Sequence, residues 1–171
     1  MASEVTFTDL FADTRVSAVH LEMRDGYILD DPAFIGWRET GRVDLDDEES
    51  REWRALVREA VGRGVTVRRA RIVSEPVSDY IRFEHAITAQ HNIAAGEVVR
   101  WLPRRLTTSV ALPGNDYWLF DGRTLLVNHF SGDSDWTGME IEPDPEAVEL
   151  CARAFEAVWD RAIPHEDYRP A

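Results

Sequence analysis

A group of arginines is the part of the sequence best suited to bind a charged ligand. Arg69 and Arg71 lie two residues apart in the β-branched stretch VTVRRARIV, so both side chains point to one face of a predicted strand. Arg82 follows on a predicted helix, close to Tyr80. Guanidinium groups pair well with carboxylate or phosphate, and a helix N-terminus also attracts anions. The spacing therefore predicts an anion-recognition cluster.

Three carboxylates in the same segment, Glu75, Asp79 and Glu84, equal the three arginines in number. Equal numbers favour a structural alternative, in which an internal ion-pair network closes on itself and needs no ligand. We expect the three arginines to lie together with one or more of these carboxylates. We also expect at least one arginine to face a cleft.

A second group of polar residues precedes this cluster. His20, Glu22 and Arg24 alternate with apolar residues, so a strand would place all three on one face. Polar residues on one face of a central strand are unusual and could line the same cleft, whereas an exposed or edge strand is the alternative. Asp121 and His129, in and after a predicted hairpin turn, complete the candidate ligand-binding residues.

Composition excludes several catalytic chemistries. All 19 basic residues are arginine, so there is no Walker A, Schiff-base or kinase lysine. The single cysteine, Cys151, excludes an internal disulfide and a thiolate zinc cluster. The histidines form no metal-binding motif, and no Gly-x-Ser-x-Gly is present. We therefore predict no catalytic residue, metal or cofactor. A small phosphate hydrolase or transferase using His20 or His129 stays open as an alternative.

The net charge of −13 is unevenly distributed along the chain. Residues 1–49 and 116–171 each carry −9, whereas residues 50–115 carry +5. The acidic ends argue against direct nucleic-acid binding, because phosphate contacts need a basic face. A structural or antitoxin-like role, in which the acidic termini bind a basic protein, stays open as an alternative. A homodimer also stays open.

Strands and helices are predicted to alternate. Strands are predicted at residues 17–28, 65–73, 98–102, 117–120, 124–130 and 136–141, between turn signals such as Asp121-Gly122. Helices are predicted at residues 46–62, 79–95 and 145–163, with a weak one at 5–14, whereas 29–45 has an irregular pattern. We therefore expect a single domain over residues 1–171 with an α/β fold, or α+β as the alternative. It would hold one mixed sheet with a β-meander, flanked by about three main helices.

Apolar residues at helical spacing predict which side chains pack on the sheet. They are Trp53, Leu56, Val57, Val61, Val148, Phe155 and Trp159. No stretch reaches the ~18 apolar residues of a membrane span. The segment Met1–Glu4 has no basic or apolar leader region, so we expect no secretory signal and a cytoplasmic location.

Several short segments of the sequence are distinctive. They are HLEMRD (20–25), RARIVSEP (69–76), DYIRFE (79–84), AGE (95–97), RWLPR (100–104), DYWLFD (116–121) and AIPH (162–165). Together they resemble a family of actinobacterial proteins of unknown function. Members are abundant in streptomycetes and are often encoded beside Xre-type helix-turn-helix regulators. The resemblance covers residues 17–169 and implies an accessory or sensing partner of a regulator. It carries over no catalytic residue.

The predicted order of elements is also similar to half of a phospholipase-D-like domain. That superfamily works through a His-x-Lys-x4-Asp motif. The comparable stretch here, Asn115–Asp121, contains no histidine, and the chain contains no lysine. The resemblance therefore implies the fold without its catalysis, and at most an anion-binding cleft. Together these observations predict a non-enzymatic regulatory or ligand-binding module. Its expected partners are a helix-turn-helix regulator and a small anionic ligand, with no direct nucleic acid and no membrane.

We predict that the isolated protein does not bind duplex DNA, because both ends of the chain are strongly acidic. An anisotropy titration with labelled duplex DNA at moderate salt should show no binding below micromolar concentrations. Tight binding that weakens steeply with added salt would reveal a concentrated basic face and contradict this prediction.

Overall fold

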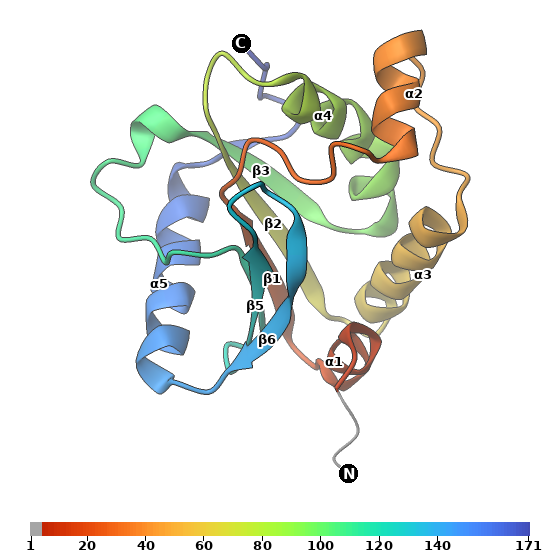
Figure 1. Ribbon diagram of the computed structural model, residues 1–171. Helices are drawn as coiled ribbons and strands as arrows, with labels where there is room; N and C mark the ends of the chain where they lie inside the picture. Colours follow the sequence, from red (N-terminus) through yellow and green to blue (C-terminus); the bar gives the residue numbers. More distant parts are fainter. Residues whose placement is uncertain (1–4) are drawn as a thin grey trace.

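A seven-stranded mixed sheet forms the centre of the molecule, with helices on both of its faces (Figure 1). The computed structural model describes residues 5–171, so the leader expectation for Met1–Glu4 lies outside the described residues. The strand order is β6-β5-β4-β1-β2-β3-β7. The strands are β1 (Ser17–Glu22), β2 (Thr66–Val73), β3 (Val98–Pro103), β4 (Tyr117–Phe120), β5 (Thr124–Phe130), β6 (Trp136–Glu142) and β7 (Ile163–Pro164). Strands β1 to β3 are parallel, and β4 to β6 form the predicted antiparallel meander.

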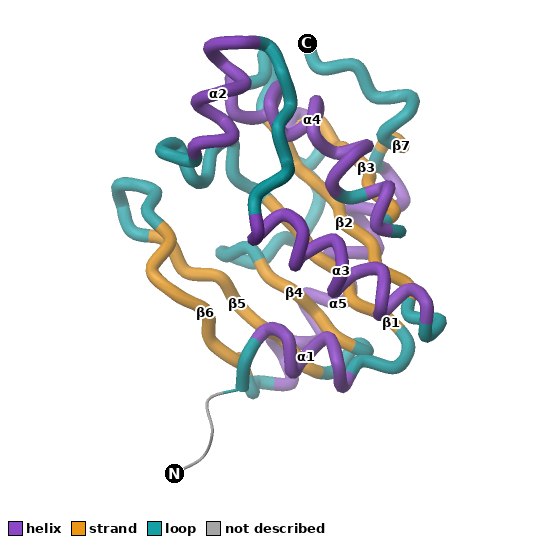
Figure 2. The backbone as a smooth tube through the Cα atoms, turned by 90° about the vertical axis from the view of Figure 1, so that its right-hand side faces the viewer, coloured by secondary structure: helices purple, strands orange, loops and turns teal. Residues whose placement is uncertain are grey.

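Five α-helices surround the sheet within residues 5–171, more than the three main helices expected. They are α1 (Phe7–Asp13), α2 (Pro32–Thr40), α3 (Glu48–Gly62), α4 (Asp79–His91) and α5 (Pro145–Arg161), with 3-10 turns η1 (Ile93–Ala95) and η2 (Arg104–Leu106). Figure 2 shows α1, α3 and α4 in front of the sheet and α5 behind it. None of the described helices has the length and apolar character that crossing a bilayer requires.

Helix α2 lies in a segment whose sequence pattern is irregular. The side chain of Asp31 accepts a backbone N–H two residues on at 2.8 Å, and Pro32 occupies the first turn. Phe34 is buried against Tyr80 and Phe83 of α4, with ring centroids 5.1 and 5.5 Å away. Packing on α4 therefore holds this helix, whose own sequence has only a weak helical pattern.

Strand β1 ends at Glu22, earlier than predicted. The next residue, Met23, donates its backbone N–H to the Asp116 side chain at 2.9 Å, and Arg104 donates to its carbonyl. These side chains replace a neighbouring strand as hydrogen-bond partners, so the chain leaves the sheet. Arg24 consequently lies beyond the strand.

Each face of the sheet carries its own apolar core. Phe155 and Trp159 of α5 are buried on one face, and Val57 of α3 is buried on the other. The remaining residues predicted to be buried are only partly covered: Trp53, Leu56, Val61 and Val148. The two helices therefore pack on the one sheet from opposite sides.

Replacing Phe155 with alanine should lower the free energy of unfolding by ~3–5 kcal/mol, the usual range for a large core aromatic. Its side chain is 1% exposed in the core beneath α5. Urea denaturation of Phe155→Ala beside Glu149→Ala, an exposed control on the same helix, measures the effect. Equal midpoints for the two variants would show that α5 contributes little to the core.

Candidate functional site

Two neighbouring parallel strands at the centre of the sheet bring the candidate side chains together. The register of β1 on β2 pairs His20 with Arg69 and Glu22 with Arg71. Because side chains alternate along a strand, all four point to the face covered by α3 and α4. They are 8%, 9%, 6% and 3% exposed respectively. The polar face of β1 is therefore buried in the middle of the sheet, and the exposed or edge-strand alternative is wrong.

Glu22 bridges the two arginines. Arg71 Nε donates a hydrogen bond to Glu22 Oε2 at 2.6 Å, and Arg69 Nη1 donates to Glu22 Oε1. Arg71 also donates to the hydroxyl of Thr88 on α4 at 2.7 Å. Burial alone would raise the pKa of Glu22, but the guanidinium groups of Arg71 and Arg69 hold it well below its ordinary value. Glu22 is therefore ionised at neutral pH.

Glu84 of α4 is the least satisfied carboxylate of this network. Its Oε2 lies 3.4 Å from Arg71 Nε, and its side chain makes no hydrogen bond within the described residues. Burial raises the pKa of Glu84 to about 7. The charge of Arg71 lowers this pKa in part, and the charge of Glu22 raises it further. Arg71 gives its shorter contacts to Glu22 and Thr88, so Glu84 is left with little compensation for its burial.

The other end of the network lies at the C-terminus of α4. Arg69 Nε donates to Glu97 Oε1 at 3.1 Å, and Asn92 Nδ2 donates to Glu97 Oε2. The Oδ1 atom of Asn92 and the Nδ1 atom of neighbouring His91 are buried and find no hydrogen-bond partner among residues 5–171. Burial, together with the charge of Arg69, lowers the pKa of His91 to about 4. His91 is therefore neutral at physiological pH.

His20 is held between the network and strand β4. Its ring stacks on Trp118 with centroids 4.3 Å apart and planes 8° from parallel. Nδ1 lies 2.7 Å from the carbonyl oxygen of Tyr117, and Nε2 lies 3.2 Å from Glu22 Oε1. Both ring nitrogens thus have protein partners, which fixes the orientation of the ring.

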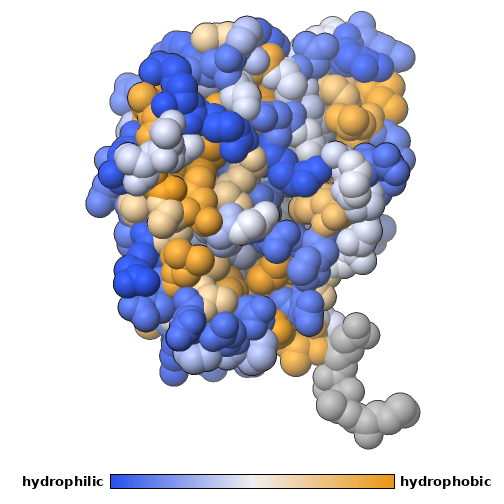
Figure 3. Space-filling model, turned by 60° about the vertical axis from the view of Figure 1, so that its left-hand side comes forward, coloured by the Kyte–Doolittle hydropathy of each residue, from blue (hydrophilic) through white to orange (hydrophobic). Residues whose placement is uncertain are grey.

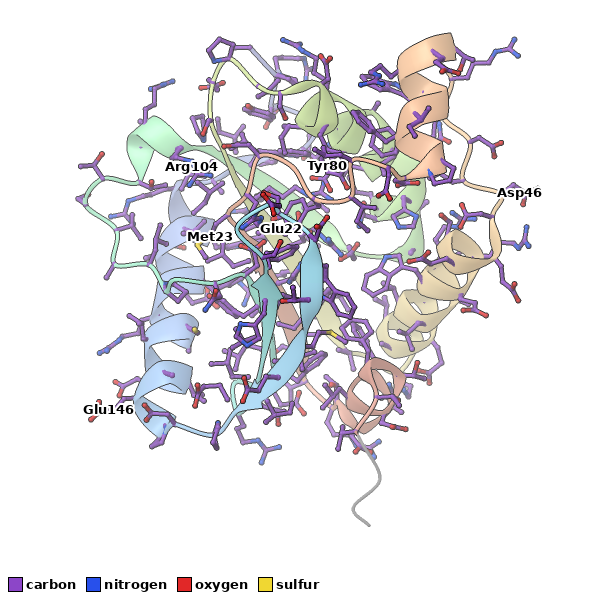
Figure 4. The ribbon with its side chains drawn as sticks, viewed as in Figure 1. Glu22, Met23, Asp46, Tyr80, Arg104 and Glu146 are labelled. Carbon is purple, nitrogen blue, oxygen red and sulfur yellow. The ribbon has the colours of Figure 1, made fainter. Side chains whose placement is uncertain are left out.

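A groove of 2380 Å³ lies above this charged floor. Its walls come from α1, α2, α3, α4 and the β5–β6 hairpin. It is lined by seven aromatic side chains: Phe7, Trp37, Trp53, Tyr80, Phe83, Trp118 and Trp136. Figure 4 shows Tyr80 and Glu22 towards the interior, whereas Asp46 lies at the outer edge between α2 and α3. The groove therefore combines an aromatic wall with a charged floor.

Unsatisfied polar atoms concentrate at this groove. Within residues 5–171, five buried side-chain polar atoms lack a hydrogen-bond partner: Arg24 Nε, Trp53 Nε1, Glu84 Oε2, His91 Nδ1 and Asn92 Oδ1. All but the Arg24 atom belong to groove-lining residues. Each such atom costs ~1–3 kcal/mol, and native proteins contain only a few. Four of the five atoms therefore lie on residues of one groove, where they leave hydrogen-bonding capacity unused.

The structure unites only part of the predicted site. His20, Glu22, Arg69, Arg71, Tyr80 and Glu84 all lie at the groove or its floor. The prediction that Arg82 joins the other arginines is wrong, because Arg82 is exposed on α4. It lies two positions from Glu84, and successive helical residues turn by about 100°, so it faces away from the sheet.

The remaining predicted residues lie elsewhere. Arg24 sits over the Phe130 ring at 4.4 Å, Asp79 is exposed, and Glu75 contacts Arg105 and the Tyr168 hydroxyl. The Asp121 side chain accepts hydrogen bonds of 2.7–2.9 Å from the backbone N–H groups of residues 15, 16 and 17, where the chain enters β1. His129 pairs with Glu140 at 3.2 Å.

His129 also lines a separate small cavity of 160 Å³ together with Tyr117 and Cys151. This cavity lies on the side of the sheet covered by α5. The outer surface of the molecule on that side mixes hydrophilic and hydrophobic residues (Figure 3). His129 and the arginine network are therefore on opposite faces of the sheet. Among residues 5–171, no group of three His, Cys, Asp or Glu side chains is placed to hold a metal ion.

Sequence reasoning did not identify the partners that complete the network. Thr88, Asn92 and Glu97 are each almost fully buried against the arginines. Thr88 and Asn92 follow Glu84 at intervals of four residues, a spacing that places them on one face of α4. That spacing was the available signal for two of them, whereas Glu97 lies outside the helix.

The pKa of Glu84 predicts a specific pH dependence. A folded-state pKa near 7, above the ordinary 4.5, means that the folded protein binds this proton more tightly than the unfolded chain. Protonation of Glu84 therefore stabilises the fold fully below about pH 4.5, and this contribution to the free energy of unfolding is lost as pH rises through 7. Glu84→Gln should match the wild type near pH 5 and exceed it at pH 8, by on the order of 2 kcal/mol. Urea denaturation across this range tests the difference.

Glu22→Gln provides the contrast, because Glu22 is ionised throughout this range. Removing its charge leaves two buried guanidinium groups poorly paired, which should cost ~3–5 kcal/mol at both pH values. A Glu84→Gln variant that behaved in the same way would show that Glu84 is a fully paired structural carboxylate.

Comparison with known proteins gives the fold and the family. No curated protein matches the chain by sequence. A solved structure of a phospholipase D family member, Nuc from Salmonella typhimurium, is similar with a TM-score of 0.50 and 13% identity, covering 95% of this chain and 88% of that one. This likeness shows a shared fold, as the order of elements implied. Residues 5–170 match the domain of unknown function DUF6879. The chain therefore belongs to the DUF6879 family.

Proposed function

We propose that this DUF6879 protein is a non-enzymatic binding module whose working surface is the groove above the charged floor. The observation that carries the proposal is the concentration of unpartnered polar atoms there, on Trp53, Glu84, His91 and Asn92. A concave site with aromatic walls and a few convergent polar groups is the usual form of a ligand site.

The non-enzymatic part of the proposal is supported by the phospholipase-D-like fold without its catalytic motif. The stretch from Asn115 to Asp121 has no histidine, and the chain has no lysine. The alternative, a small phosphate hydrolase or transferase using His20 or His129, has less support. Both ring nitrogens of His20 already have protein partners, and His129 lies on the face of the sheet opposite the arginine network.

We further propose that the module acts as the accessory partner of a helix-turn-helix regulator in the cytoplasm. The net charge of −13 supports a division of labour in which a separate, basic protein contacts DNA. The small anionic ligand expected from the sequence has less support. Arg69 and Arg71 already hold Glu22 and Glu97 at hydrogen-bond distance, whereas Glu84 lacks a hydrogen bond.

A substitution that obstructs the groove tests the proposed function. Gly36 of α2 lines the groove, and a Cβ added there meets no atom of residues 5–171 within 4 Å, so Gly36→Trp should narrow the groove without disturbing the fold. Gly62→Trp is the matched control, because Gly62 also has open space but lies outside the groove.

The three proteins should be screened by thermal shift against small molecules and peptides of positive, negative and zero charge. Hits should stabilise the wild type and Gly62→Trp but not Gly36→Trp. Hits that stabilise all three proteins equally would place binding elsewhere, and an absence of hits across the panel would contradict a binding function for this chain.

A further inference from the structure

The groove carries far more negative than positive charge. Its lining includes nine carboxylates but only three arginines, Arg42, Arg69 and Arg71, and the last two are already paired. The carboxylates include Asp30, Glu49 and Glu52 at the rim and Glu84 at the floor. Most of them lie on the exposed rim formed by the start of α2, the α2–α3 connection and α3. This field attracts a cationic occupant and repels an anionic one.

Glu84, the buried member of this set, shows the same preference through its contacts. Its side chain lines the groove although the residue is only 8% exposed, and its Oε2 atom has a 3.4 Å contact with Arg71 Nε but no hydrogen-bond partner among residues 5–171. In its ionised form the carboxylate accepts hydrogen bonds and donates none, so the partner that this form lacks is a donor. An ammonium or guanidinium group would supply both the donor and the opposite charge.

Aromatic side chains adjoin Glu84. Tyr80 lies four residues before it on α4, a spacing that makes the two side chains neighbours on one helix face. Phe83 and Trp37, whose ring centroids are 5.7 Å apart, also line the groove. Aromatic faces beside a carboxylate form an environment that attracts cations by cation–π interaction.

The spacing of the unsatisfied groups indicates an extended occupant. Glu84 and Asn92 are eight residues apart along α4, which corresponds to about 12 Å at 1.5 Å per residue. An extended polypeptide covers this distance in about four residues. The groove volume of 2380 Å³ is also well above the roughly 300–1,000 Å³ of sites for single small molecules.

We propose that the occupant of the groove is an extended, positively charged segment of a partner protein, with one lysine or arginine side chain seated against Glu84. The inference rests on the proposed function, because it names the ligand class for the same groove. The donor groups of the segment also reach towards Asn92 and His91, at the far end of the floor.

Peptides of equal length and opposite charge test this inference by fluorescence anisotropy. The probes are an arginine- and lysine-rich peptide, its glutamine analogue, its glutamate analogue and free spermidine. The wild type should bind the basic peptide more tightly than the other three probes, and binding should weaken with salt. Gly36→Trp should abolish the binding, and Gly62→Trp should retain it.

Charge-neutralising variants locate the contact. Glu84→Gln should weaken binding about tenfold or more, the equivalent of one charge-assisted hydrogen bond. A rim variant, Asp30→Asn with Glu49→Gln and Glu52→Gln, should weaken binding and flatten its salt dependence. A control with the same charge change on α5, Glu146→Gln with Glu149→Gln and Asp160→Asn, should stay within about twofold of wild type. Circular dichroism confirms that each variant is folded.

Each other outcome overturns the inference in a recognisable way. Equal binding of the glutamine or glutamate peptide, still blocked by Gly36→Trp, removes the cationic requirement and leaves the proposed function intact. If spermidine binds and the basic peptide does not, the occupant is a small cation and the proposal of a protein segment is wrong. Equal losses in the rim and α5 variants show diffuse charge attraction instead of a seat at Glu84. If none of the four probes binds but the thermal-shift screen finds a ligand that Gly36→Trp excludes, only this inference is overturned. If neither experiment finds a ligand, both proposals are overturned.

Discussion

The ion pairs that join Glu22 to Arg69 and Arg71 are the interaction on which the rest of the structure depends. Two guanidinium groups on one face of a central strand would repel each other and would each cost several kcal/mol to bury. Glu22, on the neighbouring parallel strand, offers one carboxylate oxygen to each of them. This arrangement makes one face of the sheet polar at its centre, while the opposite face under α5 stays apolar.

The charged centre determines how the helices can cover the sheet. Along β2, Val67 and Val73 flank the two arginines and join separate apolar clusters. Helices α3 and α4 meet the sheet through these clusters, and α4 also lends polar side chains to the arginines between them. The groove lies over this polar centre and is bounded by α2, which is held by Phe34 on α4. The position of the groove and the burial of the charges are therefore two aspects of one arrangement.

The stretch from Asp116 to Asp121 serves the scaffold. Asp116 accepts a hydrogen bond from the Met23 N–H where β1 ends, and Asp121 accepts hydrogen bonds from the N–H groups where β1 begins. Between them, Tyr117 and Leu119 pack into the core beneath α5. A fold supplies positions for side chains, and the side chains present decide the chemistry. Here they secure both ends of the strand that carries Glu22.

Local features of this protein are determined by its sequence alone. The bounds of β4 and β5 were predicted correctly, because Asp121-Gly122 sets a tight turn between two runs of strand-forming residues. The shared face of Arg69 and Arg71 follows from strand periodicity. Only the tertiary structure decides which carboxylates meet them. Glu22 is 47 residues from Arg69, and the long-range register of β1 on β2 brings them together, whereas the sequence-near Glu75 and Asp79 lie elsewhere. Pairing partners in a parallel sheet are set by the packing of distant segments, so no short-range pattern specifies them.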